Sequence, residues 1–274
     1  LVGELTVAFV KGLQGDDPRY WKTASLMKHF MANSNEDGRD STSSDFDNRL
    51  FHEYYAYPFR KGIANGGSQA FMAAYNAWNG TPMTIHPVFE KIRKEWGMKG
   101  IICTDAGAVS LLVSAYKAFP NQTEAVVAVV KAGVGQFLDR YKPQVYEALE
   151  KGMLTESDID KTIRTNYYVA LRLGLLDATP DKTPYGHIGV TDTVAPWNNK
   201  EIHEFVRLVT AKSVVLLKNE NNLLPLDKKK IKSIAIIGPR ADEVLEDWYS
   251  GTSPYAVTIL QGIKNAVGPN VEVH

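Results

Sequence analysis

The sequence has few of the features that would assign it at once to a class of protein. Cys103 is its only cysteine, so no disulfide can form within the chain. Basic and acidic residues number 31 each, and the resulting formal net charge of zero gives no support for binding to nucleic acid or to an anionic membrane surface. No apolar run approaches the length of a transmembrane helix, so we expect no membrane contact.

Signatures of metals and cofactors are also missing. The six histidines show no zinc-ligand spacing. The apolar segment that ends at Gly238 is not followed by a G-x-G-x-x-G pattern, and Pro239 lacks the amide proton that a phosphate group would need. We therefore expect neither a metal nor a cofactor. With 274 residues, 44% of them hydrophobic, the chain is long enough for one large globular domain or two smaller ones.

Strand-like and helical segments alternate over residues 1–177, which is typical of an α/β fold. Each of the expected strands ends in polar residues: Lys28 and His29 in 25–32, Tyr75 and Asn76 in 70–76, Asp105 after 100–104, and Asp139 after the weaker strand or loop 132–138. The carboxyl ends of parallel strands meet at one rim of a barrel, so these side chains would converge there. A (β/α)8 barrel is favoured, with a doubly wound sheet as the alternative.

The helices expected between these strands follow from apolar spacing and from start and stop residues. They are 2–15, 46–64 with a break or kink at Pro58, 87–96, a helix from about Ala108, 121–131, 143–152, and 155–173. Thr155 and Asp158 resemble a capping box at the start of the last of these. Residues 79–82 have the chemistry of a turn.

The composition changes after residue 177. Residues 178–199 are rich in proline and glycine and poor in apolar residues, which indicates a linker. Residues 200–274 then begin a second α/β domain. Its expected elements are a helix over 200–217, a strand over 232–239, a helix over 257–266 and a strand over 271–273.

Asp105 is the first candidate for a catalytic residue. It follows the apolar strand 101–103, and Gly107 comes just after it. A buried strand that ends in a carboxylate and a glycine turn is a common way to present a reactive group at the rim of a sheet or barrel. The alternative is that Asp105 only caps the helix that starts near Ala108.

Several motifs, in this order, resemble those of glycoside hydrolase family 3, the β-glucosidase and β-xylosidase family. They are Lys-His-Phe at 28–30, Asp-Asn-Arg at 47–49, Met-Ala-Ala-Tyr-Asn at 72–76 with Asn-Gly at 79–80, Thr-Asp at 104–105, Ala-Lys-Ser-Val-Val-Leu-Leu-Lys-Asn at 211–219 and Leu-Pro-Leu at 224–226. The resemblance implies that residues 1–177 are the second half of the catalytic (β/α)8 barrel. Residues 200–274 would then be the N-terminal part of an α/β sandwich domain.

The resemblance also implies a retaining, exo-acting β-glycosidase that removes terminal β-D-glucosyl or β-D-xylosyl residues from an oligosaccharide or an aryl or alkyl β-glycoside. Such enzymes place two carboxyl groups about 5–5.5 Å apart. Asp105 matches the nucleophile, which forms a covalent glycosyl-enzyme. Lys28 and His29 match the pair that holds sugar hydroxyls, and Tyr75 and Met72 complete the expected substrate-binding set. Tyr75 is also a candidate hydrogen-bond donor to the Asp105 carboxylate. The plainer alternative for Lys28 and His29 is a structural ion pair and a core histidine.

Three departures from the family pattern bear on the function. Ala106 stands where the family often has a tryptophan, and the chain begins after the strand expected to carry a sugar-binding arginine. The acid/base glutamate lies beyond the end of the chain in much of the family. Glu36 and Asp37, in the loop after His29, are interpreted as solvated carboxylates and not as the missing acid.

The chain starts without an initiator methionine or a signal peptide, and a helical pattern is already present at Leu1, so we expect a piece of something longer. The missing half of the barrel would come from the same parent chain, a complementary fragment or a second copy. A periplasmic or secreted location is favoured over a cytoplasmic one. The alternative function is a non-catalytic carbohydrate-binding relative, or an inactive structural fragment.

Overall fold

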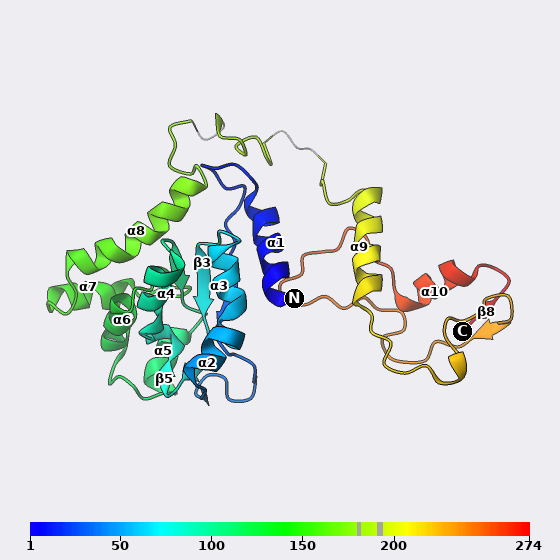
Figure 1. Ribbon diagram of the computed structural model, residues 1–274, viewed down its shortest axis with the longest axis horizontal. Helices are drawn as coiled ribbons and strands as arrows, with labels where there is room; N and C mark the ends of the chain where they lie inside the picture. Colours follow the sequence, from blue (N-terminus) through cyan, green and yellow to red (C-terminus); the bar gives the residue numbers. More distant parts are fainter. Residues whose placement is uncertain (180–181, 191–193) are drawn as a thin grey trace. The chain divides into compact units, whose positions relative to one another are not determined.

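The computed structural model describes residues 1–179, 182–190 and 194–274. The chain forms two compact units, residues 1–190 (unit 1) and 191–274 (unit 2), whose elements are traced in Figure 1. The predicted linker, residues 178–199, includes residues 180–181 and 191–193, which lie outside the described residues.

A parallel sheet lies at the centre of unit 1. Its strands are β1 (Met27–Phe30), β3 (Ala70–Ala73) and β6 (Ile101–Cys103), in the order β1-β3-β6. The peptide bonds Lys28–His29 and Phe30–Met31 of β1 are cis. Segment 132–138, for which the sequence left a weaker strand or a loop open, forms no strand of the described sheet, and Gln136 makes an isolated parallel bridge to Cys103.

The helices of unit 1 follow the predicted alternation. They are α1 (Val2–Gln14), α3 (Tyr57–Ala64), α4 (Val88–Trp96), α5 (Ala108–Ser114), α6 (Gln122–Lys131), α7 (Lys142–Glu150) and α8 (Glu156–Arg172). The predicted capping box of Thr155 and Asp158 is present, with each residue bonded to the backbone of the other. Local start signals therefore sufficed to place this helix.

The single helix predicted over 46–64 is wrong in its details. Asp47 caps the short helix α2 (Asn48–Leu50), which runs into the π-helix η1 (Phe51–Tyr55) before α3 begins. Pro58 lies in the first turn of α3, where a helix needs no amide donor. The helical stretch is therefore interrupted just before Pro58, so the predicted break is confirmed, and Pro58 helps to start α3.

The turn predicted at residues 79–82 is a two-residue hairpin. β4 (Ala77–Trp78) pairs antiparallel with β5 (Thr81–Pro82), and β2 (Ser43–Ser44) pairs parallel with β4. Asn79 and Gly80 between them have φ values of 47° and 80°. Two successive left-handed residues define the type I′ turn that Asn-Gly favours, so the turn prediction is confirmed.

A 3₁₀ turn, η2 (Met83–Ile85), leads from this hairpin to α4 through His86. The imidazole Nδ1 of His86 accepts a hydrogen bond from the Val88 amide (3.1 Å), and its ring stacks on Trp78 with centroids 4.8 Å apart. Burial lowers the pKa of His86 to about 4. The neutral imidazole thus takes the place of a helix N-cap.

Lowering the pH should therefore destabilise the fold through His86. The pKa of His86 is about 4 in the folded protein, against the ordinary value of 6.5 in the unfolded chain. Between these two pH values the unfolded chain therefore binds a proton that the folded chain does not. The free energy of unfolding should fall as the pH drops from 6.5 to 4. Above pH 6.5 His86 should contribute no pH dependence to it. Urea titrations across this range should show a flatter pH profile for His86→Asn. The exposed His274→Gln is the control, and an unchanged slope for His86→Asn would contradict the assignment.

Aromatic side chains dominate the core between this sheet and its helices. Phe30 of β1 is fully buried, and its ring lies 4.9 Å from that of Phe59 on α3 and 4.8 Å from that of Phe71 on β3. Phe89 and Trp96 of α4 complete the cluster. Burying each such side chain contributes about 1.5–3 kcal/mol, so this cluster fixes the carboxyl end of β1, where the polar residues begin.

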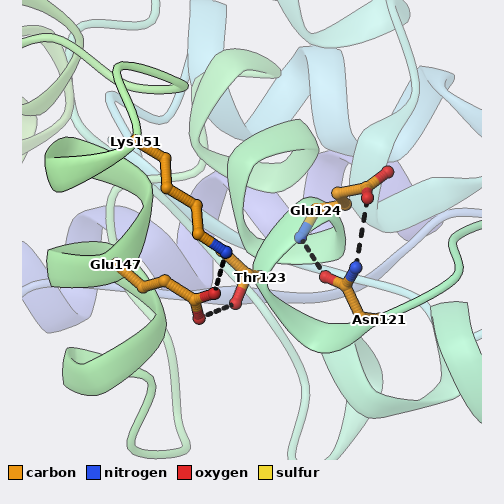
Figure 2. Close-up of polar contacts among 5 residues, drawn as sticks. All are labelled: Asn121, Thr123, Glu124, Glu147 and Lys151. Carbon is orange, nitrogen blue, oxygen red and sulfur yellow. Dashed lines mark hydrogen bonds and ion pairs between the residues drawn. The ribbon is translucent and has the colours of Figure 1, made fainter.

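Polar contacts join α6 to α7 on the outside of unit 1. Figure 2 shows Glu147 of α7 accepting hydrogen bonds from the Thr123 hydroxyl (2.6 Å) and from Lys151. It also shows Asn121, whose Oδ1 accepts the Glu124 amide (3.0 Å) at the start of α6. Asn121 is therefore the N-cap of α6, a helix that contributes two fully buried valines, Val126 and Val129, to the core.

Replacing Asn121 by alanine should lower the free energy of unfolding by about 1 kcal/mol, the usual cost of losing an N-cap. The reason is that the Glu124 amide would lose its acceptor. Urea denaturation measures the effect. Lys131→Ala, at the exposed end of the same helix, should change stability little, and equal losses for the two variants would argue against the capping role.

Unit 2 contains a strand–helix–strand pattern. Strands β7 (Ser233–Ile234) and β8 (Glu272–Val273) pair in parallel, and α10 (Ile259–Val267) lies between them in the chain. Helix α9 (Lys200–Ser213) and the 3₁₀ turn η4 (Glu220–Asn222) precede them. The elements are shorter than predicted.

Two boundaries in unit 2 differ from the sequence prediction. α9 stops at Ser213, because Val214 is extended with φ −71° and ψ 127°. The strand predicted over 232–239 is reduced to β7, which pairs with β8 over two residues.

Candidate functional site

Polar side chains from successive strands meet at the carboxyl end of the unit 1 sheet. His29 is on β1, Tyr75 follows β3, and Asp105 follows β6. His29 Nε2 lies 3.2 Å from Asp105 Oδ2, and the Asp105 side chain is 15% exposed. The predicted convergence of these side chains at one end of the sheet is therefore present.

His29 interacts with Asp105 as a neutral hydrogen-bond donor. Burial lowers the pKa of His29, and the nearby charges of Lys28 and Arg39 lower it further, while Asp105 acts in the opposite direction. Because the net shift is downward, the imidazole is uncharged at neutral pH. Its Nε2–H then donates to Asp105 Oδ2.

The interpretation of Asp105 as a mere helix cap is wrong. α5 begins at Ala108 with Gly107 as its N-cap, and no side chain of the cap residue bonds to the helix. Asp105 Oδ1 instead accepts the amide of the next residue, Ala106, at 2.8 Å. The carboxylate is thus bonded from one side by His29 and from the other by its own loop.

Tyr75 contacts the loop after Asp105. Its hydroxyl donates to the carbonyl oxygen of Ala106 at 2.6 Å. Burial, and then the charge of Asp105 and a hydrogen bond to it, raise the pKa of Tyr75 to about 12, so the hydroxyl stays protonated and can donate. The hydroxyl of Tyr116, which follows α5, donates to the backbone oxygen of Tyr75 (2.9 Å) and holds Tyr75 in place.

Lys28, Met72 and Cys103 lie at the same end of the sheet. Lys28 is exposed, and its charge contributes to the lowered pKa of His29 and partly offsets the raised pKa of Cys103. Met72 is 8% exposed and pairs in register with Cys103. Burial and the charge of Asp105 raise the pKa of Cys103 to about 12, so its thiol is unreactive near neutral pH.

Arg39 lies beside these residues, although no motif in the sequence singled it out. Its guanidinium lies 5.0 Å from the Tyr75 ring centroid, and its Nη1 lies 2.7 Å from Glu36 Oε2. These residues and Ala106 line a hollow of about 430 Å³. The expectation that Glu36 is a solvated carboxylate agrees with its 72% exposed side chain. Only the folding of the polar loop over the sheet brings Arg39 here.

Asp139 was expected at a strand end but was not selected as a site residue. Its Oδ2 accepts the Gly107 amide at 2.6 Å, so it bonds the same loop that carries Asp105. Among the described residues, no group of three or more His, Cys, Asp or Glu side chains is placed to hold a metal ion. Nor does any helix in the described ranges have the length and apolar character needed to cross a membrane.

Two family models match this chain. Residues 1–165 match the family model described as the glycosyl hydrolase family 3 N terminal domain, and residues 214–272 match that of the family 3 C-terminal domain. A probable β-D-xylosidase 7 of Arabidopsis thaliana is 32% identical over 97% of this chain and 36% of its own length. A periplasmic β-glucosidase of Salmonella typhimurium is 36% identical over 96% of this chain and 35% of its own length.

A solved structure shows the same fold. A family 3 exo-β-xylosidase, in complex with a xylobiose aziridine activity-based probe, superposes with a TM-score of 0.84 and 25% identity over 99% of this chain and 36% of that one. The chain thus spans just over a third of the length of the relatives it matches. Unit 1 is part of a (β/α)8 barrel, and an α/β segment follows it. The chain belongs to glycosyl hydrolase family 3.

Proposed function

We propose that the protein containing this segment is a retaining, exo-acting β-glycosidase that releases terminal β-D-glucosyl or β-D-xylosyl residues. The observation that carries the proposal is the Asp105 carboxylate at the end of β6, held by His29 Nε2 at 3.2 Å and by the Ala106 amide at 2.8 Å. A nucleophilic carboxylate must be fixed in direction, and these two groups hold both of its oxygens.

The chemistry would proceed in two displacements. Asp105 attacks the anomeric carbon, the glycosidic bond breaks, and a general acid protonates the leaving oxygen. The resulting ester between Asp105 and the sugar is then cleaved by water, which the same acid, now a base, deprotonates. Lys28 and His29 would bind sugar hydroxyls beside Asp105, with Tyr75 and Met72 completing that wall.

The general acid and the remaining barrel strands would come from other parts of the same polypeptide. The supporting observation is that the matched relatives are almost three times as long as the matched segment, since it covers 36% of the first of them. β1 also offers a free side for them: within the described ranges, β3 is its only partner strand. No carboxylate of this chain is assigned the role of acid.

The substrate class follows from the relatives, which carry names of β-xylosidases and β-glucosidases. A periplasmic enzyme is among them, and a periplasmic or secreted location is our proposal for this protein also. The substrates that we propose are oligosaccharides and aryl or alkyl β-glycosides. The buried, protonated thiol of Cys103 takes no part in the reaction.

The test is to trap the covalent intermediate. The full-length protein is incubated with a 2-fluoro-2-deoxy β-glucoside and with the xyloside, whose fluorine slows the second step. Mass spectrometry of the digest should show the added sugar on the peptide that contains Asp105. A sugar on another carboxylate would overturn the assignment of the nucleophile. Absence of any hydrolysis of aryl β-glycosides would favour a non-catalytic carbohydrate-binding protein.

A further inference from the structure

The peptide unit that joins Ala106 to Gly107 is held at both ends by side chains from distant segments. Its carbonyl oxygen accepts the Tyr75 hydroxyl (2.6 Å), and its N–H donates to Asp139 Oδ2 (2.6 Å). We propose that Asp139 is a positioning residue, which together with Tyr75 clamps this peptide and thereby orients the Asp105 carboxylate. The proposal rests on the proposed function.

The clamped peptide is adjacent to the one that contacts Asp105. The Ala106 N–H donates to Asp105 Oδ1 at 2.8 Å. If the following peptide rotated, the backbone at Ala106 would turn with it, and this donor would leave the carboxylate. Misplacement of a reacting group by about 1 Å can cost about 100-fold in rate. A clamp on the next peptide therefore acts directly on the geometry of attack.

Asp139 is in turn tied to the residue that precedes Asp105. The Thr104 amide donates to the Gln136 oxygen (3.0 Å), and the Leu138 amide donates to Thr104 Oγ1 (3.2 Å). Thr104 is fully buried. Residues 136–139 thus run alongside the end of β6. This course places the Asp139 carboxylate beside the loop that carries Asp105.

Helix α8 contacts the chain just before residues 136–139. Gly135 donates its amide to the Ile102 oxygen (3.0 Å), and its own oxygen accepts the Asn166 side chain of α8 (2.8 Å). A Cβ on Gly135 would lie 2.5 Å from Thr165 Oγ1 and 2.8 Å from the Thr162 oxygen, which no side chain could tolerate. The close approach to α8 requires glycine here and fixes the start of the segment.

The first experiment measures kinetics of the full-length protein with aryl β-glycosides. Asp139→Ala should lower kcat by about 10- to 100-fold while KM changes by less than about threefold, because the substrate wall is untouched. Asp139→Asn keeps an acceptor oxygen for the Gly107 amide and should recover most of the loss. Asp158→Ala, which removes a helix-capping carboxylate outside the site, should lower stability and leave kcat unchanged.

The second experiment tests whether Tyr75 and Asp139 act on one peptide. The losses in kcat for Tyr75→Phe and Asp139→Ala should be less than multiplicative in the double variant, because either change already frees the same peptide. Hydrogen exchange at the Gly107 amide should accelerate in Asp139→Ala and not in Asp158→Ala. This readout is independent of activity.

Specific outcomes would overturn the proposal. These are an unchanged kcat and Gly107 exchange rate in Asp139→Ala, an Asp139→Asn as slow as Asp139→Ala, or fully multiplicative losses. If the wild-type protein hydrolyses no β-glycoside, the proposed function fails and the positioning role fails with it. Accelerated Gly107 exchange in Asp139→Ala would still show that the clamp exists, so the two failures can be told apart.

Discussion

Asp105→Asn in the full-length protein should abolish turnover and leave the fold intact. The amide has nearly the shape of the carboxylate, and its one oxygen can still accept the Ala106 amide, while its NH2 group takes the place of Oδ2 beside His29 Nε2. It lacks the negative charge needed to attack the anomeric carbon, so we expect kcat to fall by about 10³- to 10⁶-fold. Steady-state kinetics with an activated aryl β-glucoside and β-xyloside measure this, and circular dichroism reports the fold.

The control is Asp16→Asn, in the loop after α1, which should retain wild-type kcat. An Asp105→Asn protein with activity within a few-fold of wild type would end the assignment of the nucleophile. The pH profile of the reaction adds a check on His29, whose pKa is lowered by burial. Acidification that protonates His29 would convert its hydrogen bond to Asp105 into an ion pair. His29→Gln should then alter the acidic side of the profile.

Lys28→Ala should produce the second-largest loss. In the proposed function the ammonium group binds hydroxyls of the terminal sugar, and losing one charge-assisted contact in a dehydrated site costs about 2–4 kcal/mol of transition-state binding. That corresponds to about 30- to 1000-fold in kcat/KM. Competitive inhibition by glucose and xylose should weaken in parallel, because the ground state loses part of the same contact.

Lys99→Ala provides the matched control. Lys99 is also exposed and also adjoins a strand of the central sheet, but it precedes β6 and so lies at the opposite end from Asp105. Its removal should leave kcat/KM unchanged. Equal effects of the two lysine variants, or no effect of Lys28→Ala, would show that Lys28 serves the fold and not the sugar.

Local features of the sequence determined the order and type of most elements. The Asn79–Gly80 turn, the capping box at Thr155 and the apolar spacing of α6 are each encoded by contiguous residues, and each is present in the structure. The motif order also sufficed for the family. Local signals succeed here because turn conformations, caps and helical faces depend on residues a few positions apart.

The tertiary structure decided the geometry around Asp105. Asp139 bonds Gly107 across 32 positions of sequence, and Tyr75 bonds Ala106 across 31, so no local pattern could reveal either contact. The same applies to segment 132–138, which meets the sheet through the bridge of Gln136 to Cys103.

The charge state of His29 was decided in the same way. The sequence indicated that His29 either binds sugar hydroxyls or is a core histidine, and neither interpretation determines its protonation state. Burial at the end of β1 outweighs the attraction of Asp105 and keeps the imidazole neutral. The sequence by itself thus determined which residues this protein brings to the end of the sheet. Only the packed structure decided which of them touch and which carry charge, because burial and long-range hydrogen bonds exist only once distant segments meet.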